Sequence, residues 1–216
     1  FIAFYEWRDF EQALGFLNRA ADTYPAVESR LWLAQIHLRR SRVLRQMGNP
    51  QAALHAAEMA QMLVSGAGAE GKAALAETQL TIAELLSSIG YRDREIVMCL
   101  NQFMQNAKRP LGVDVTWSRA HELLGDASFN LGQYDAAVLA YRAALQFNPD
   151  HPWEVSLLYR IARSYYQQRA YQETVETVRS MLAAAAADEQ PVTDYRVYDL
   201  LGSAQFALGK YDQAAS

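Results

Sequence analysis

Residues 125–149 constrain the fold most strongly, because small, aromatic and proline residues stand there at the spacing of a packed helical hairpin. Gly125 is placed where two helices would cross, and helices packed at the near end of the usual interaxial range, about 8 to 10 Å, leave no space for a branched side chain. Gly132 follows at the expected end of the first helix, where a left-handed backbone conformation costs little without a Cβ atom. Pro149 then ends the second helix. The segment predicts two antiparallel helices joined by a tight turn.

The same pattern recurs along the chain at intervals of about 37 to 42 residues. The positions equivalent to Gly132 are Arg8, Gly48, Gly90, Arg169 and Gly209. After each of them, mostly apolar or small residues mark one face of a helix at its 3.6-residue period. Seven residues before each anchor from Gly48 onward the residue is always small: Ser41, Ala83, Gly125, Ala162 and Gly202. Gly90 alone gives a poor apolar face, which improves if the anchor moves to Tyr91, so we expect a one-residue insertion in that turn. At Arg169 we expect a slightly different turn, because this residue has a side chain.

This pattern resembles the tetratricopeptide repeat family. The best match comprises Leu124, Gly125, Gly132, Tyr134, Ala137, Tyr141, Ala144 and Pro149, and a second comprises Leu201, Gly202, Gly209, Tyr211 and Ala214. The resemblance implies an all-α fold, a right-handed superhelical solenoid of antiparallel helical hairpins. The repeats are degenerate, and their length is more similar to that of variants in bacterial signalling regulators and kinesin light chains than to the usual 34-residue unit.

We expect one array over residues 1–216, cut from a longer protein, because both ends fall inside a repeat. Its approximate units are 1–25 (partial), 28–64, 72–107, 116–149, 153–187 and 194–216 (partial). Glycine and proline gather in the expected connections 65–71, 108–114 and 187–194. Asp194 is predicted to cap the helix that follows it, and Thr116 or Ser118 to cap a helix that begins near Arg119.

Composition narrows the function classes. The chain has 216 residues, 51% of them apolar, and a formal net charge of −4, so a sequence-independent nucleic-acid binder is not favoured. The single cysteine, Cys99, excludes an intrachain disulfide framework. No apolar run approaches the roughly 20 residues of a membrane-spanning helix. The sequence identifies no compartment, and a cytoplasmic location is the default expectation.

Catalysis is not expected, and neither is a cofactor or a metal site. His37 and His121 occupy the same place in two repeats, where Leu158 and Tyr198 also stand, which indicates a packing role. His151 lies in a turn, and Cys99 is expected to be a small buried side chain. Carboxylates four residues apart, such as Glu122 and Asp126, are common on ordinary helices.

The resemblance places the functional surface on the concave face, which the first helix of each hairpin lines. Residues thirteen, ten, six, three and two positions before each anchor are assigned to that face. Among them, aromatic residues and arginines exceed what packing within a hairpin demands, and both types are favoured at peptide-binding hot spots. The candidate partner-binding residues are Arg119, Phe129, Asn130, Tyr159, Arg163, Tyr166, Arg196 and Phe206. The carboxylate clamp of the family, which grips a peptide C-terminus, is not reproduced.

The sequence therefore favours an interaction scaffold that presents a groove to a protein or peptide. A sensory or regulatory domain of a larger signalling or transcription-regulating protein and a self-associating scaffold are the alternatives. One local basic cluster, Arg39, Arg40, Arg42 and Arg45, is expected to pair with acids on a neighbouring helix rather than to bind nucleic acid. Its role as a functional surface stays open.

Overall fold

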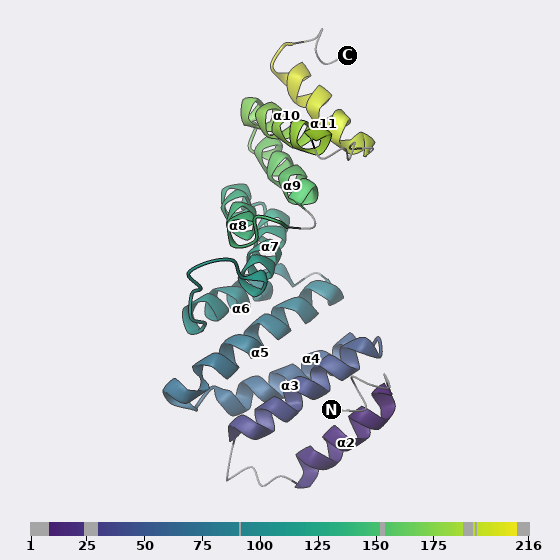
Figure 1. Ribbon diagram of the computed structural model, residues 1–216, viewed down its shortest axis with the longest axis vertical. Coiled ribbons are helices and arrows are strands. Elements are labelled where there is room, and N and C mark those ends of the chain that lie inside the picture. Colours follow the sequence, from purple (N-terminus) through teal and green to yellow (C-terminus); the bar gives the residue numbers. More distant parts are fainter. Residues whose placement is uncertain are drawn as a thin grey trace. The chain divides into compact units, whose positions relative to one another are not determined.

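The computed structural model describes residues 9–23, 30–90, 92–151, 154–187, 192 and 194–210. All regular structure in these ranges is α-helical, which confirms the predicted all-α class. The chain divides into two compact units, Phe1–Arg109 and Pro110–Ser216. Within each unit the helices follow one another in chain order, each packed beside the next (Figure 1).

The first unit contains five described helices, and adjacent helices along the chain contact each other. Their bounds are α2 Phe10–Thr23, α3 Arg30–Gln46, α4 Pro50–Val64, α5 Gly68–Ile89 and α6 Asp93–Asn106. The most extensive contacts join α3 to α4 and α5 to α6, which are the expected hairpins. Where α3, α4 and α5 meet, Leu38 and Ala60 are fully buried with Ala34 and Val64.

The second unit also contains five described helices. Their bounds are α7 Val115–Asn130, α8 Tyr134–Phe147, α9 Glu154–Gln167, α10 Tyr171–Ala187 and α11 Tyr195–Ala207. Helices α7 and α8 form one hairpin and α9 and α10 the next, and α11 packs on α10. A core of buried side chains that includes Tyr141, Leu157 and Ile161 joins the two hairpins.

Tyr141 shows why the crossing position must be small. A Cβ atom on Gly125 would lie only 2.4 Å from Cε1 of the Tyr141 ring. The ring is 2% exposed, and its hydroxyl donates a hydrogen bond to Oδ1 of Asp126 over 2.8 Å. The tyrosine of α8 therefore occupies the space that any side chain at Gly125 of α7 would need.

The turns after the first helices are nearly alike. Gly48, Gly132 and Gly209 adopt φ values of 76°, 74° and 73°. Arg169 adopts φ 63°, and its turn closes with the same pair of backbone hydrogen bonds as the turn at Gly132. The expectation of a different turn at Arg169 is wrong, because the two helices packed on either side impose the left-handed conformation, at a cost of roughly 1 kcal/mol for a residue with a Cβ atom.

The turn after α5 does differ. Gly90 has φ 87° and closes back to Leu86 with a backbone hydrogen bond of 2.9 Å. Tyr91 lies outside the described residues. Helix α6 buries Ile96, Leu100 and Phe103, which are the residues predicted for a register shifted by one position.

Of the two predicted helix starts, one is corrected and one is confirmed. Helix α7 begins at Val115, and its N-cap is Asp114, whose side chain accepts the backbone N–H of Trp117 at 2.9 Å, so neither Thr116 nor Ser118 caps it. Ser118 is buried inside the helix, where its hydroxyl donates to the carbonyl of Ala144 across the hairpin. By contrast, the predicted cap Asp194 is confirmed, since its carboxylate accepts the backbone N–H of Arg196.

The connection predicted over residues 65–71 is shorter than expected, because α5 already begins at Gly68. Gly71 is buried in its first turn, where a Cβ atom would lie 2.6 Å from Cβ of Ala67 and 3.1 Å from the carbonyl oxygen of Val64. Gly71 thus permits close packing at a helix start rather than a long loop. Among the described residues, no helix is both long and apolar enough to cross a membrane.

Candidate functional site

The eight candidate residues all belong to the second unit. Arg119, Phe129 and Asn130 lie on α7, Tyr159, Arg163 and Tyr166 on α9, and Arg196 and Phe206 on α11. In the structure, some of them form a cluster around Arg163, others line a pocket between α9 and α11, and two arginines form ion pairs with acidic side chains. Asn130 is exposed, one position after Phe129.

Arg163 joins two of the predicted aromatic residues. Its guanidinium carbon lies 4.9 Å from the ring centre of Phe129 on α7 and 5.9 Å from that of Tyr159, one turn earlier on α9. Phe129 also packs edge-on against Tyr134, with ring centres 5.3 Å apart, and this contact restrains its ring. Arg163 itself is exposed, so a cation supported by two aromatic rings faces solvent. We call Phe129, Tyr159 and Arg163 the arginine–aromatic cluster.

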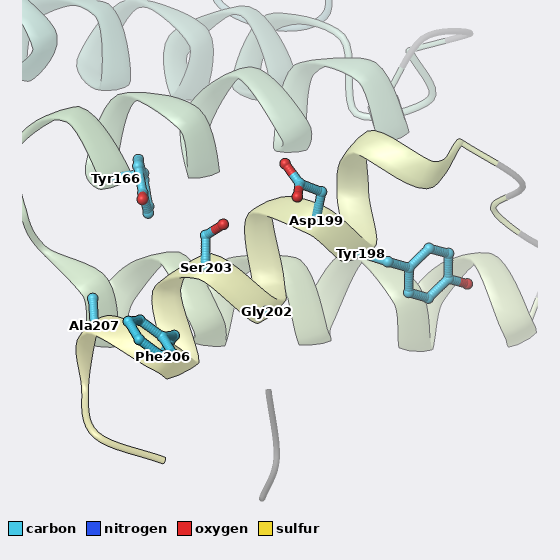
Figure 2. Close-up of a pocket in the computed structure, with 7 residues that line it drawn as sticks. All are labelled: Tyr166, Tyr198, Asp199, Gly202, Ser203, Phe206 and Ala207. Atoms are coloured by element: carbon cyan, nitrogen blue, oxygen red, sulfur yellow. The ribbon is translucent and has the colours of Figure 1, made fainter. Parts of the chain in front are cut away.

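Tyr166 and Phe206 line a pocket of about 480 Å³ between α9 and α11. Its other lining residues are Tyr198, Asp199, Gly202, Ser203 and Ala207, all on α11. Asp199 and Ser203 project from the side of α11 that faces Tyr166 (Figure 2). Phe206 is 64% exposed at the rim. Tyr166 is held by an edge-on contact with Tyr171, with ring centres 5.5 Å apart, which matches the contact of Phe129 with Tyr134 one hairpin earlier.

Arg119 is already engaged within its own helix. Its Nη1 lies 2.6 Å from Oε2 of Glu122, and the other oxygen of that carboxylate accepts from Nη1 of Arg160 at 3.1 Å. The same Arg160 nitrogen lies 2.9 Å from Oδ1 of Asp126. Arg160 therefore ties α9 to two carboxylates of α7. The sequence analysis missed Arg160, and no signal within one repeat reveals that it pairs with the preceding hairpin.

The carboxylates of this network are not ordinary exposed groups. Glu122 is 7% exposed, although its position was assigned to the groove face, and the equivalent Leu38 is fully buried. Burial raises the pKa of Asp126 above its usual range, while Arg160 opposes the shift. Burial and the adjoining Asp126 carboxylate raise the pKa of Tyr141 as well, so this hydroxyl stays a hydrogen-bond donor. Glu122 and Asp126 hold neighbouring helices together, and the position ten residues before the anchor does not face a partner in these two helices.

Arg196 also has an intramolecular role. Its guanidinium binds the carboxylate of Asp194, with Nη2 to Oδ2 at 2.6 Å, beside the backbone hydrogen bond of the N-cap. Hydrogen bonding to Arg196 lowers the pKa of Asp194. This pair fixes the first turn of α11.

The basic cluster of the first unit is paired largely as expected. Arg42 and Arg45 on α3 form ion pairs with Glu77 and Glu84 on α5, the second with Nη1 to Oε2 at 2.6 Å. Arg39 and Arg40 are half-buried. The cluster therefore connects successive hairpins through half of its arginines.

His37, His121 and Cys99 have packing environments. His37 is buried, and burial lowers its pKa below the usual range. His121 stacks on Phe147, with ring centres 5.4 Å apart. Burial raises the pKa of Cys99 to about 11, so this thiol is protonated at neutral pH. No group of three or more histidine, cysteine or acidic side chains within metal-binding distance occurs in the described ranges.

A comparison with protein families matches residues 118–151 to the tetratricopeptide repeat model. The similarity in sequence to the tetratricopeptide repeat family therefore covers residues 118–151. This range holds Gly125, Gly132 and Tyr141, which carry the resemblance seen in the sequence. No curated protein matches the chain in sequence.

Solved structures of tetratricopeptide-like proteins resemble most of the chain in fold. A tetratricopeptide repeat protein from Parabacteroides merdae aligns with a TM-score of 0.66 and 16% identity, over 98% of this chain and 72% of the other. The protein MamA aligns with a TM-score of 0.65 and 19% identity, over 84% and 86%. A putative kinesin light chain from Podospora anserina aligns with a TM-score of 0.61 and 18% identity, over 87% and 92%. At these identities, the similarity concerns the fold.

The family and the fold agree with the predicted class. Tetratricopeptide-like arrays generally mediate protein–protein interaction and scaffolding, and as a family they are not typically enzymes. The eight candidate residues stay a prediction about where such an interaction takes place in this chain.

Proposed function

We propose that the second unit binds a partner protein or peptide along the exposed side of α7, α9 and α11, with the arginine–aromatic cluster as the anchor. The carrying observation is Arg163, which is exposed although its guanidinium lies over the rings of Phe129 and Tyr159. Aromatic residues and arginine are enriched among the residues that supply most binding energy at protein interfaces. In this proposal, this surface takes the part of the partner-binding groove expected from the sequence.

Preorganisation supports this assignment. A long flexible side chain loses about 0.5 to 1.5 kcal/mol of conformational freedom when a partner immobilises it. Arg163 is already restrained by Phe129 and Tyr159, and Phe129 is restrained by Tyr134. Less ordering is therefore left for the binding step.

The other two arginines have smaller roles in this proposal. Arg119 pairs with Glu122 and Arg196 with Asp194, so a partner would have to compete with an existing ion pair at each. Both stand at the N-terminal part of their helices, away from Phe129 and Phe206 at the other end. We place the binding energy at the cluster and the pocket, and assign these two arginines to the margin.

Site-directed photocrosslinking in cells that produce the full-length protein tests the proposal. A photoreactive amino acid at Gln167, an exposed position next to Tyr166, leaves the cluster intact. The same amino acid at Leu139, which is 68% exposed on α8, serves as the control position. We expect discrete adducts from position 167 that position 139 does not give.

A matched pair of variants then tests the cluster itself. Tyr159→Ala combined with Arg163→Glu should abolish the adducts formed from position 167, with the helical circular dichroism unchanged. Arg142→Glu is the control, because Arg142 also lies over a tyrosine, Tyr165 at 5.7 Å, but is presented by α8. Adducts that persist in the double variant, or that disappear equally in the control, would show that the anchor is elsewhere.

A further inference from the structure

The pocket between α9 and α11 has a chemistry different from that of the arginine–aromatic cluster. Among the described residues that line it, Asp199 is the only charged one. The neighbouring cation on the same helix, Arg196, is bound to Asp194, and Arg163 lies over Phe129 and Tyr159 and is not among the lining residues. The pocket thus carries a negative charge, whereas the arginine–aromatic cluster carries a positive one.

The Tyr198 hydroxyl donates a hydrogen bond to the carbonyl of Val192, whereas three other polar side chains of the pocket differ from it. Within the part of the chain that the structure describes, neither the Asp199 carboxylate, the Ser203 hydroxyl nor the Tyr166 hydroxyl has a hydrogen-bond partner. Asp199 and Ser203 stand one turn apart and project from the same side of α11, the side that faces Tyr166 (Figure 2). Together they offer a carboxylate and two hydroxyls to one ligand.

The aromatic side chains that line the pocket favour a guanidinium group over other cations. Tyr166 and Phe206 line the same pocket as Asp199, and Phe206 is largely exposed. A guanidinium group carries five donors in one plane, binds a carboxylate through two parallel hydrogen bonds and stacks on aromatic rings. An ammonium group offers a point charge without the plane. A volume of about 480 Å³ is sufficient to admit one long side chain.

We propose that this pocket binds an arginine side chain of the partner segment, with the guanidinium on Asp199 and its stem between Tyr166 and Phe206. The inference rests on the proposed function, because the segment is the one anchored at the arginine–aromatic cluster. It specifies the partner: a segment with an arginine that meets α11, while the part that meets Arg163 carries no positive charge.

The test uses a displayed library of random dodecapeptides selected on the intact chain. Selected peptides should share an arginine. Replacing it by alanine, or introducing Asp199→Asn into the protein, should each weaken binding about tenfold, the range of a charged hydrogen bond. The two changes together should cost little more than either alone, because both remove the same contact. Replacing the peptide arginine by lysine should recover only part of the affinity.

Two controls make the outcome decisive. Asp150→Asn removes an exposed carboxylate in the turn after α8 and should leave affinity unchanged. Peptides that bind the Asp199→Asn protein as tightly as the unaltered one, or that lack a shared arginine, overturn the inference. If such peptides are still lost with Tyr159→Ala and Arg163→Glu, the proposed function stands without the arginine pocket. Selected peptides that neither change affects would contradict both.

Discussion

Gly125→Ala should destabilise the second unit, although alanine is the better helix former. The added Cβ atom would meet the Tyr141 ring at 2.4, 2.5 and 2.9 Å from Cε1, Cδ1 and Cζ. These distances are well inside van der Waals contact. The ring cannot move aside easily, because Tyr141 is 2% exposed and its hydroxyl is hydrogen-bonded to Asp126.

The size of the effect follows from two opposing contributions. Overpacking a well-filled core costs about 1 to 3 kcal/mol, and the rigid ring argues for the upper end. Replacing glycine by alanine inside a helix returns about 1 kcal/mol. The net loss should be about 2 kcal/mol. In a chain that already carries Tyr141→Ala the clash is gone, so Gly125→Ala should instead stabilise by about 1 kcal/mol. The coupling between the two positions is then about 3 kcal/mol.

Hydrogen exchange followed by mass spectrometry is the suitable assay, because repeat arrays need not unfold in one step. Protection of peptides from α7 and α8 should fall about 30-fold in Gly125→Ala, the equivalent of 2 kcal/mol. Peptides from α3 and α4 in the first unit provide the internal reference. If Gly125→Ala increased protection in the unaltered background, or if Tyr141→Ala did not reverse its sign, the close-crossing argument would be refuted.

Three further predictions concern other positions. Tyr141→Ala should cost about 4 kcal/mol of unfolding free energy but Tyr134→Ala only about 1 kcal/mol, because Tyr141 is buried whereas Tyr134 is half-buried with an edge-on contact to Phe129. Equal losses in urea titrations would mean that the assigned register of the repeats is wrong. Cys99, whose pKa is raised to about 11 from 9.0, should react with Ellman's reagent only after unfolding. Because the thiol ionises at lower pH in the unfolded chain, its contribution to the free energy of unfolding is full below pH 9.0 and is lost as the pH rises toward 11. Cys99→Ala should therefore lessen the loss of stability at alkaline pH. Arg169→Gly should raise the unfolding free energy by roughly 0.5 to 1 kcal/mol, because Arg169 holds φ 63° at a place where glycine stands in equivalent turns; a loss of stability would show that its side chain matters more than its backbone.

The sequence predicted best the features that depend on contacts within one hairpin. Small residues at Gly125 and Ala162 and glycine anchors such as Gly132 act between helices that are close along the chain, so their spacing carries the register. The insertion near Gly90 was predictable for the same reason, since α6 buries Ile96 and Leu100. The N-cap of α7 was misplaced because Asp114, Thr116 and Ser118 can each cap a helix, and the choice was made by burial of Ser118 against α8.

What the sequence could not supply were the contacts between hairpins. Arg160 stands next to the core residue Ile161, and its pairing with Glu122 and Asp126 depends on how far one hairpin is offset from the next. That offset is set by packing over many residues and by no single motif. The same limit explains why Glu122 was assigned to an exposed face although it is buried. The arginine–aromatic cluster was anticipated by residue type, whereas its geometry required the structure.

The ion pairs between successive first helices also limit how such a gene can evolve. In the first unit, cations of α3 meet acids of α5, and in the second, acids of α7 meet the cation of α9. A duplicated α3 in the place of α5 would set Arg45 against a second Arg42, and a duplicated α7 in the place of α9 would put Leu123 where Arg160 now stands. Unequal recombination between these repeats would therefore remove ion pairs between neighbouring hairpins. The order of the hairpins is thus constrained by charge even where their shapes are interchangeable.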